Sequence, residues 1–189
     1  MTATDRVGGD ERLRLFLGLR LPEPVLDCVE AWQSDQLLGE HLQGVRAVPR
    51  GHLHVTLAFL GSRAAGELGA IVGELRAAAA DAPADLRLAP ARYRETRSVA
   101  MLVLDDLHGG VTALAEDVQG RLERLGAYRR EDRPWLPHLT VARFRERPRL
   151  ELDPPAMGTF VPSDAAAYLS RLHPGGAQYV VLESVALGG

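Results

Sequence analysis

The fold is decided by the stretch His52-Leu53-His54-Val55-Thr56-Leu57-Ala58-Phe59-Leu60-Gly61, whose pattern returns in Pro137-His138-Leu139-Thr140-Val141-Ala142-Arg143-Phe144. Both stretches place His-x-Thr in a run of β-branched and large apolar residues, which predicts a buried strand. Side chains alternate between the faces of a strand, so the His and Thr of each motif share one face while their neighbours point into a core. Two such motifs facing each other would supply a base, an acid and two hydroxyl donors, a catalytic set for a phosphoryl group.

One pattern occurs twice along the chain: a strand, a helix and then a strand that carries His-x-Thr. The first copy covers residues 12–21, 22–38 and 53–60, and the second covers 99–104, 111–125 and 138–144. The two histidines are 138 − 54 = 84 positions apart, at equivalent places in two halves. This self-similarity predicts a pseudo-twofold α+β fold in which the motif strands line a shared groove, the kind of interface that ligand sites favour.

The remaining elements follow from hydrophobic periodicity and turn residues. We expect a helix over residues 64–80, strands over 86–93, 157–161, 166–172 and 178–187, and a short strand within 45–48. Residues 1–11 are polar and charged and are predicted to be a disordered leader. Residues 12–189 are then predicted to form a single bilobal domain, which suits a chain of 189 residues.

Composition indicates a cytoplasmic protein, and we expect a monomer. Hydrophobic residues make up 46% of the chain, enough for a substantial core, yet no run of eighteen apolar residues predicts a membrane span. We find no secretory signal. Cys28 is the one cysteine, so no intrachain disulfide can form, which suits a reducing compartment. Cys28 lies in a helical pattern and is interpreted as a packed core residue.

The chain contains no lysine, because all 22 of its basic residues are arginine. A Walker-type phosphate loop needs its lysine, and Schiff-base chemistry needs an amine, so both are excluded. A ligase that forms a lysyl-adenylate is excluded for the same reason. If this protein joins RNA ends, it must therefore do so by reversing a phosphodiesterase step.

Net charge is −3, which argues against strong non-specific binding of nucleic acid. The stretch of residues 121–149 is an exception, with nine arginines and four acidic residues and so a local charge of 9 − 4 = +5. Two interpretations stay open. This stretch could steer an RNA phosphate toward the second motif, or it could be a solvated helix-and-loop surface.

The segments His54-Val55-Thr56-Leu57 and His138-Leu139-Thr140-Val141 resemble the paired H-x-T-x motifs of the two-histidine (2H) phosphoesterase superfamily. Within it, the chain is most similar to the RNA 2′,3′-cyclic phosphodiesterases, also called 2′-5′ RNA ligases, from about Arg12 to Leu187. Further similarity lies in Leu15-Phe16-Leu17-Gly18-Leu19, in Phe59-Leu60-Gly61, in Ala142-Arg143 and in the segment of residues 169–179. The resemblance implies a bilobal fold with two antiparallel sheets lining a central groove and helices on the outside.

The chemistry that the resemblance implies is metal-independent and cofactor-free hydrolysis of RNA or nucleotide 2′,3′-cyclic phosphate ends, leaving a 2′-phosphate. Imidazoles titrate near neutral pH, so His54 and His138 can serve as the acid and base. We assign His54 as the acid and His138 as the base, although the sequence does not distinguish them. The hydroxyls of Thr56 and Thr140 can donate to phosphate oxygens. Reversal of the same step would join a 2′-5′ linkage.

Arg143 lies three positions beyond Thr140, so an ideal strand would point it away from the site. A bulge or a strand end would turn it back, and the resemblance implies that it contacts phosphate. Trp135 could stack on a base or pack in the core. Tyr179 and Ser170 are interpreted as structural, and His52 as a residue at the solvent edge. The other three histidines, His41, His108 and His173, are expected at the surface.

Three alternatives compete with this interpretation. A metal-dependent hydrolase is one, but the chain lacks H-E-x-x-H and Cys-based ligand spacing, and neither motif has an acid beside its histidine. A non-catalytic RNA- or nucleotide-binding module is the second, although binding alone does not need a matched acid and base. The third is a 2H phosphodiesterase that acts on another cyclic or 2′-5′-linked nucleotide.

Overall fold

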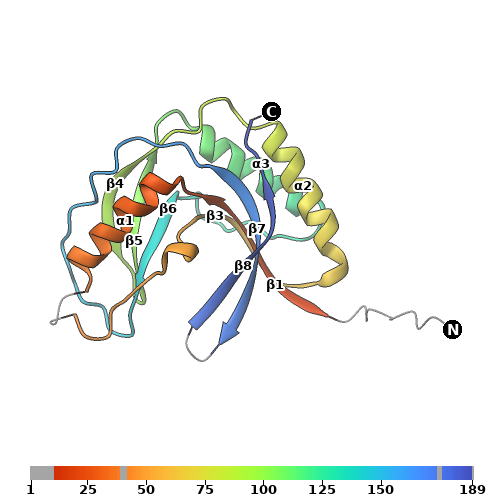
Figure 1. Cartoon of the computed structure of the whole chain (residues 1–189). Helices are drawn as coiled ribbons and strands as arrows, with labels where there is room; N and C mark the ends of the chain where they lie inside the picture. Colours follow the sequence, from red (N-terminus) through yellow and green to blue (C-terminus); the bar gives the residue numbers. More distant parts are fainter. Residues whose placement is uncertain (1–10, 39–41, 174–175, 189) are drawn as a thin grey trace.

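A computed structural model describes residues 11–38, 42–173 and 176–188 of the chain (Figure 1). Its helices and strands are β1 (Arg12–Arg20), α1 (Glu23–Gln36), β2 (Arg46–Ala47), the 3-10 turn η1 (Arg50–His52), β3 (Val55–Ala64), the 3-10 turn η2 (Ala65–Glu67), α2 (Leu68–Ala80), β4 (Leu88–Glu95), β5 (Val99–Asp106), α3 (Gly110–Arg124), β6 (His138–Arg143), β7 (Asp164–His173) and β8 (Gly176–Val185). All of the predicted leader except Glu11 lies outside the described residues, as does His41. The division into a leader and one bilobal domain stays a prediction.

The strands form one curled antiparallel sheet in the order β4-β5-β6-β3-β1-β7-β8, with β2 paired to β6 (Figure 1). Strands β3 and β6 meet at the single pair Val55↔Leu139. The predicted α+β class is therefore confirmed, and the two expected sheets are the two halves of this sheet, joined at that pair.

The helices cover the two halves crosswise. Helix α1, which begins after Pro22 and buries Val25 and Val29, lies beside β4, β5 and β6 (Figure 1). Helices α2 and α3 pack against each other on the half that contains β3 and β7. Each motif strand is thus backed by a helix that the predicted repeat assigns to the other motif.

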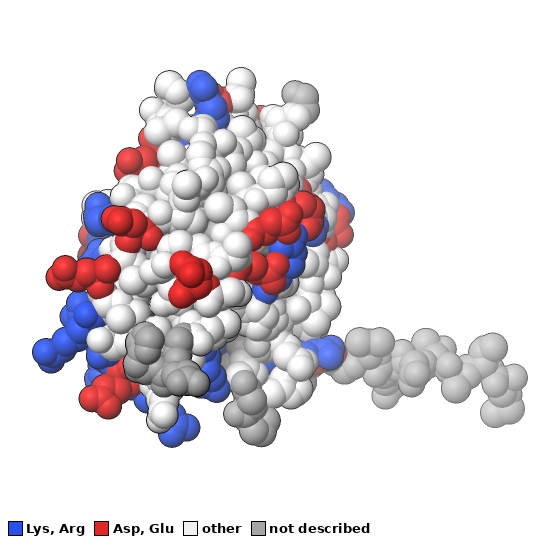
Figure 2. All heavy atoms as spheres, turned by 60° about the vertical axis from the view of Figure 1, so that its left-hand side comes forward, with Lys and Arg blue, Asp and Glu red and all other residues white. Residues whose placement is uncertain are grey.

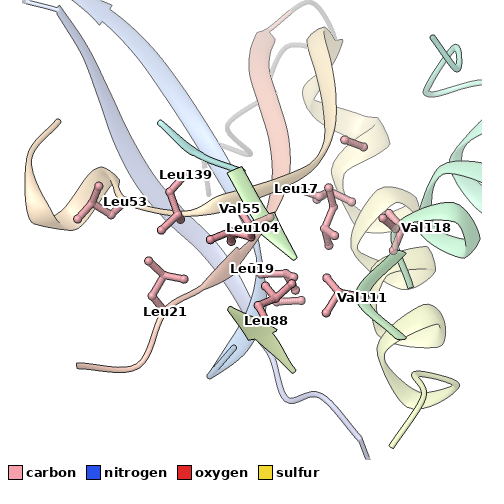
Figure 3. Close-up of a cluster of buried hydrophobic side chains, with 14 of the residues drawn as sticks. Leu17, Leu19, Leu21, Leu53, Val55, Leu88, Leu104, Val111, Val118 and Leu139 are labelled. Carbon is pink, nitrogen blue, oxygen red and sulfur yellow. The ribbon is translucent and has the colours of Figure 1, made fainter. Parts of the chain in front are cut away.

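The core lies between the helices and one face of the sheet. Val55 and Leu139, the residues that join the two halves, are fully buried there, close to Leu17 and Leu19 of β1 (Figure 3). Burying a leucine or valine side chain contributes roughly 1.5–3 kcal/mol, so the junction is among the strongly anchored parts of the fold. The alternation predicted for the motif strands is correct, because their His and Thr side chains point to the opposite face.

One predicted strand is absent from the described residues. The run 157–161 forms a single bridge, Leu88↔Phe160, instead of a ladder. Pro154, Pro155 and Pro162 flank this run and cannot donate backbone hydrogen bonds, which explains why pairing stops after one residue. Within the described part of the chain, no helix is long and apolar enough to cross a membrane.

Candidate active site

A groove of about 640 Å³ opens on the sheet face that carries the motif side chains. Four of the five predicted site residues line it, namely His54, Thr56, Thr140 and Arg143. Arginines and aromatic rings complete much of the wall: Arg14, Phe16, Arg46, Phe59 and Tyr179. The groove therefore combines the predicted polar set with surfaces suited to an anion and to a base.

His138, the fifth predicted residue, is not among the residues that line the groove, but the strand register places it beside them. Since Val55 pairs with Leu139 in antiparallel fashion, His54 lies across from Thr140 and Thr56 lies across from His138. The four polar residues thus surround one buried pair, and in the backbone register each histidine lies across from the threonine of the other motif. This crossed arrangement is the pseudo-twofold geometry that the sequence predicted.

Both imidazoles are oriented by the same backbone contact. Nδ1 of His54 lies 2.7 Å from the carbonyl oxygen of His52, and Nδ1 of His138 lies 2.8 Å from that of Leu136. A carbonyl can only accept, so each Nδ1 carries the proton and donates it. Nε2 of each ring is then the atom available for proton transfer.

His54 is enclosed by aromatic rings. Its ring centroid lies 4.7 Å from that of Phe16 and 5.6 Å from those of Tyr168 and Tyr179. This burial is the main reason why the pKa of His54 is lowered to about 4, and the nearby charge of His138 contributes in the same direction. The ring is therefore neutral near pH 7, and its Nε2 accepts a hydrogen bond of 3.0 Å from the Thr56 hydroxyl.

Gly18 of β1 permits the close approach of His54, a role that the sequence prediction did not include. A Cβ atom added at Gly18 would lie 3.1 Å from Cδ2 of His54 and 3.1 Å from the carbonyl oxygen of Val55. A glycine inside a predicted strand often marks such an approach, so Leu17-Gly18-Leu19 contained the signal.

Each motif strand contains a β-bulge three residues after its histidine. On β3, Ala58 pairs with Leu17 and Thr56 with Gly18, so Leu57 is the extra residue. Val141 holds the same position on β6, between the pairs Ala142↔Ala100 and Thr140↔Met101. A bulge reverses the alternation of faces beyond it.

The bulges decide which side chains reach the groove. Arg143, which an ideal strand would point away, lies on the groove face with Thr140, as predicted for a bulged strand. Phe59 occupies the equivalent position on β3 and lines the groove with 48% of its surface exposed. The Arg14 guanidinium lies 4.8 Å from the centroid of the Phe59 ring, in a cation–π contact.

Two buried glutamines hold the bulged carbonyls. Nε2 of Gln33, on α1, donates to the carbonyl oxygen of Val141 at 2.7 Å, and Nε2 of Gln119, on α3, donates to that of Leu57 at 2.9 Å. These side chains are 3% and 5% exposed, respectively. Sequence analysis missed both, although each is a polar residue on the apolar face of a predicted helix.

The segments before the two histidines are also fixed. Arg50 of η1 pairs with Asp27 at 2.8 Å and with Glu30 at 2.6 Å, which ties the turn before His54 to α1. Trp135, before His138, donates from Nε1 to the carbonyl oxygen of Thr56 at 3.0 Å. The partly buried side chain of Trp135 also packs against the core, which favours the packing interpretation.

Comparisons with known proteins identify the family of the chain. The family model described as the 2′-5′ RNA ligase superfamily matches residues 21–173, most of the chain. The chain belongs to this superfamily. An RNA 2′,3′-cyclic phosphodiesterase of Thermus thermophilus is 33% identical over 185 residues, covering 94% of this chain and 91% of that protein.

Solved structures of this superfamily and of similar proteins share the fold. The Thermus thermophilus protein TT0787 superposes with a TM-score of 0.78 at 27% identity, over 93% of this chain and 98% of that one. E. coli LigT, solved with 3′-AMP, gives 0.75 at 22% identity, over 95% and 100% of the two chains. The latter likeness concerns the fold alone.

Four of the nine arginines in the basic stretch of residues 121–149 form ion pairs within the described residues. Arg121, Arg130, Arg133 and Arg147 each pair with an acidic residue, and of the nine arginines only Arg143 lines the groove. Figure 2 shows acidic and basic side chains intermingled on the face that it presents. These pairs favour the solvated-surface interpretation over steering by the whole stretch.

The other residues that the sequence analysis singled out fall into two groups. His52, Ser170 and Tyr179 line the groove, and their expected roles, an edge residue and two structural residues, stay predictions. Cys28 is partly buried on α1, whereas His108 and His173 are exposed as expected. In the described part of the chain, no cluster of three or more His, Cys, Asp or Glu side chains is arranged to hold a metal ion.

Proposed function

We propose that this protein hydrolyses RNA 2′,3′-cyclic phosphate ends to 2′-phosphates by acid–base catalysis at His54 and His138. The observation that carries the proposal is the crossed arrangement of two His–Thr pairs around Val55↔Leu139, at the wall of a groove. The Thermus relative, named as an RNA 2′,3′-cyclic phosphodiesterase, supports the substrate class.

In the proposed reaction, Nε2 of His138 takes a proton from water as the oxygen attacks phosphorus. The bond from phosphorus to the ribose 3′ oxygen breaks, and that oxygen receives a proton from Nε2 of His54. Thr56 and Thr140 donate hydrogen bonds to the non-bridging oxygens, and Arg143 balances their charge. The product is a 2′-phosphate, and the two histidines have exchanged protonation states.

The surroundings of the histidines support these roles. Three aromatic rings enclose His54, whereas no aromatic ring of the described residues stacks on His138, which leaves the latter more open to an attacking water. His54 is neutral in the free protein, but an anionic phosphate beside it raises its pKa and so favours its protonation. An imidazolium in an apolar enclosure is a strong acid, which suits the protonation of a departing alkoxide.

The same step with an RNA 5′-hydroxyl in place of water would join RNA ends through a 2′-5′ linkage. His138 would take the proton from that hydroxyl as its oxygen attacks phosphorus, and His54 would protonate the departing 3′ oxygen, so the histidines keep their roles. No nucleotide cofactor is needed, because the strained ring supplies the energy of the new bond. Ligation would be tested with paired RNA ends held at high concentration.

The test is turnover of 2′,3′-cyclic AMP and of a short RNA with a 2′,3′-cyclic end, in excess chelator. Wild type is compared with His54→Ala and His138→Ala, and products are resolved as 2′- or 3′-phosphates. We expect chelator-resistant formation of 2′-phosphate that both variants lose. Activity that the chelator abolishes would favour a metal-dependent hydrolase, and no turnover would favour a different nucleotide or a binding module.

Two further properties stay predictions. A monomer is expected, to be checked by light scattering of the purified protein at several concentrations. A cytoplasmic location is expected from the lone Cys28 and would be checked by fractionation of cells that express the full chain.

A further inference from the structure

Two arginines lie directly opposite each other in the groove. Arg46 of β2 pairs in register with Arg143 of β6, and both side chains line the groove. Like charges opposite each other on one sheet face are destabilising. A cationic pair in a groove that binds anions therefore indicates that anions occupy this end of it.

Neither arginine is neutralised within the described residues. Arg46 and Arg143 take part in no ion pair there, whereas Arg50 has three carboxylate partners and Arg121 has three. Carboxylates are thus recruited to other arginines of this chain but not to these two. The positive charge of the groove is free to meet a ligand.

Arg46 lies at the end of the groove that is remote from His138. Strand β2 pairs with the last two residues of β6, beyond the pair Val55↔Leu139 that joins β3 to β6. Arg143 is the last residue of β6, three positions beyond Thr140, and its charge acts on His54 and His52. If Arg143 binds the cyclic phosphate beside the histidines, Arg46 is left to bind a second anion.

We propose that Arg46 binds the phosphodiester on the 5′ side of the terminal nucleotide, and thereby makes the groove selective for the end of an RNA strand over a free mononucleotide. This inference rests on the proposed function. An RNA strand carries its next phosphate one nucleotide away, and a guanidinium can bind it through two parallel hydrogen bonds.

The test is a cycle of two changes, one in the protein and one in the substrate. The protein is wild type or Arg46→Gln. The substrate is a dinucleotide with a 2′,3′-cyclic end, whose internal linkage is either a phosphodiester or a neutral methylphosphonate. The cyclic mononucleotide is measured in parallel. Arg124→Gln is the matched control, because Arg124 lies at the end of α3 and its loss changes net charge equally.

For the phosphodiester dinucleotide, Arg46→Gln should lower kcat/KM about tenfold, as expected for a charge-assisted hydrogen bond. The methylphosphonate should cost wild type the same factor, and the two changes together should cost no more than either alone. The mononucleotide and the Arg124→Gln control should show wild-type kinetics.

Three results would overturn this inference. Equal losses on mononucleotide and dinucleotide would mean that Arg46 contacts the scissile phosphate, and additive effects would mean that it does not contact the internal linkage. Unchanged kinetics in Arg46→Gln would remove its role while the proposed function stands. By contrast, absence of turnover by wild type on every cyclic substrate would contradict the proposed function itself.

Discussion

Strands β3 and β6 have the same backbone and different surroundings. From His54 to Leu60 and from His138 to Phe144, the sequence of buried and exposed positions is identical. Both strands bulge three residues after the histidine, and both bulged carbonyls accept from a glutamine of the opposite helix. The shared pattern explains how the fold aims two imidazoles at one place.

The side chains around this common backbone differ. His54 is enclosed by three aromatic rings and bonded to Thr56, whereas within the described residues His138 makes a hydrogen bond through Nδ1 alone. Beyond the bulges, β3 presents Phe59 where β6 presents Arg143. The comparison teaches that symmetry supplies the backbone geometry, while the departures from symmetry give the two imidazoles different surroundings and the two ends of the groove different residues.

The largest effect should come from removing either histidine. His54→Ala and His138→Ala should each lower kcat/KM on a cyclic nucleotide by about 10²–10⁴, the usual contribution of a positioned acid or base. The double variant should lose little more than either single variant, because residues that act as a unit are non-additive. Steady-state kinetics check this. If the losses of the two single variants multiplied in the double variant, the histidines would act independently, which would contradict a coupled pair.

The aromatic enclosure of His54 also predicts how the stability of the fold depends on pH. Because the pKa of His54 falls from 6.5 to about 4 on folding, the unfolded chain binds the proton more tightly. Stability should therefore decrease as pH falls from about 6.5 toward 4, by about 3 kcal/mol in total.

Urea unfolding of wild type and His54→Gln between pH 7.5 and 4.5 measures this contribution, since carboxylates that also titrate affect both proteins alike. If His54→Gln and wild type lost stability in parallel, the aromatic enclosure would not control the proton affinity of His54.

The glutamines test whether the two backbones are equivalent. Gln119→Leu and Gln33→Leu should each destabilise the fold by about 1–3 kcal/mol, because a buried bulge carbonyl loses its donor. Gln33→Leu leaves the Val141 carbonyl with the Val48 amide at 2.9 Å but also removes a bond of 3.0 Å to the Val48 carbonyl, so the two variants should cost similar amounts. Chemical denaturation gives both values.

Gln36→Leu is a suitable control for these variants, because Gln36 ends α1 at the surface and its loss should change stability by less than about 0.5 kcal/mol. If Gln33→Leu and Gln119→Leu were as stable as this control, the bulges would not depend on the glutamine side chains.

The smallest effect should come from the strand behind His54. In Gly18→Ala the new Cβ would lie 3.1 Å from His54 Cδ2, so the ring must shift by a few tenths of an ångström. We expect a fall in kcat of about tenfold or less with little change in KM, since a small misplacement of a catalytic group costs rate. Gly51→Ala is the control, because a Cβ there meets no atom within 4 Å. Equal kinetics for the two variants would show that His54 tolerates displacement.

Much of this molecule could be predicted from its sequence because the decisive signals are local. Alternation placed the motif strands, and duplication predicted the pseudo-twofold groove around His54, Thr56, His138 and Thr140. The role of Arg143 was predicted from the family resemblance, on the condition that a bulge turns its side chain toward the site.

The features that sequence analysis missed depend on distant pairing. Bulges at Leu57 and Val141 exist only relative to neighbouring strands, and Gln33 and Gln119 acquire their roles from carbonyls of the opposite half. Tyr179 comes from a strand 125 positions after His54 in the chain (179 − 54) and closes its enclosure. No single-chain periodicity encodes such contacts.

The central claim, an acid at His54 and a base at His138, is tested most directly by a substrate whose leaving 3′ oxygen is replaced by sulfur. A thiolate leaves without being protonated, so this 2′,3′-cyclic substrate needs the base but not the acid. The account predicts that it restores turnover in His54→Ala to near the wild-type rate, while His138→Ala stays inactive. Restoration of His138→Ala instead would reverse the roles, and restoration of neither would contradict acid–base catalysis by this pair.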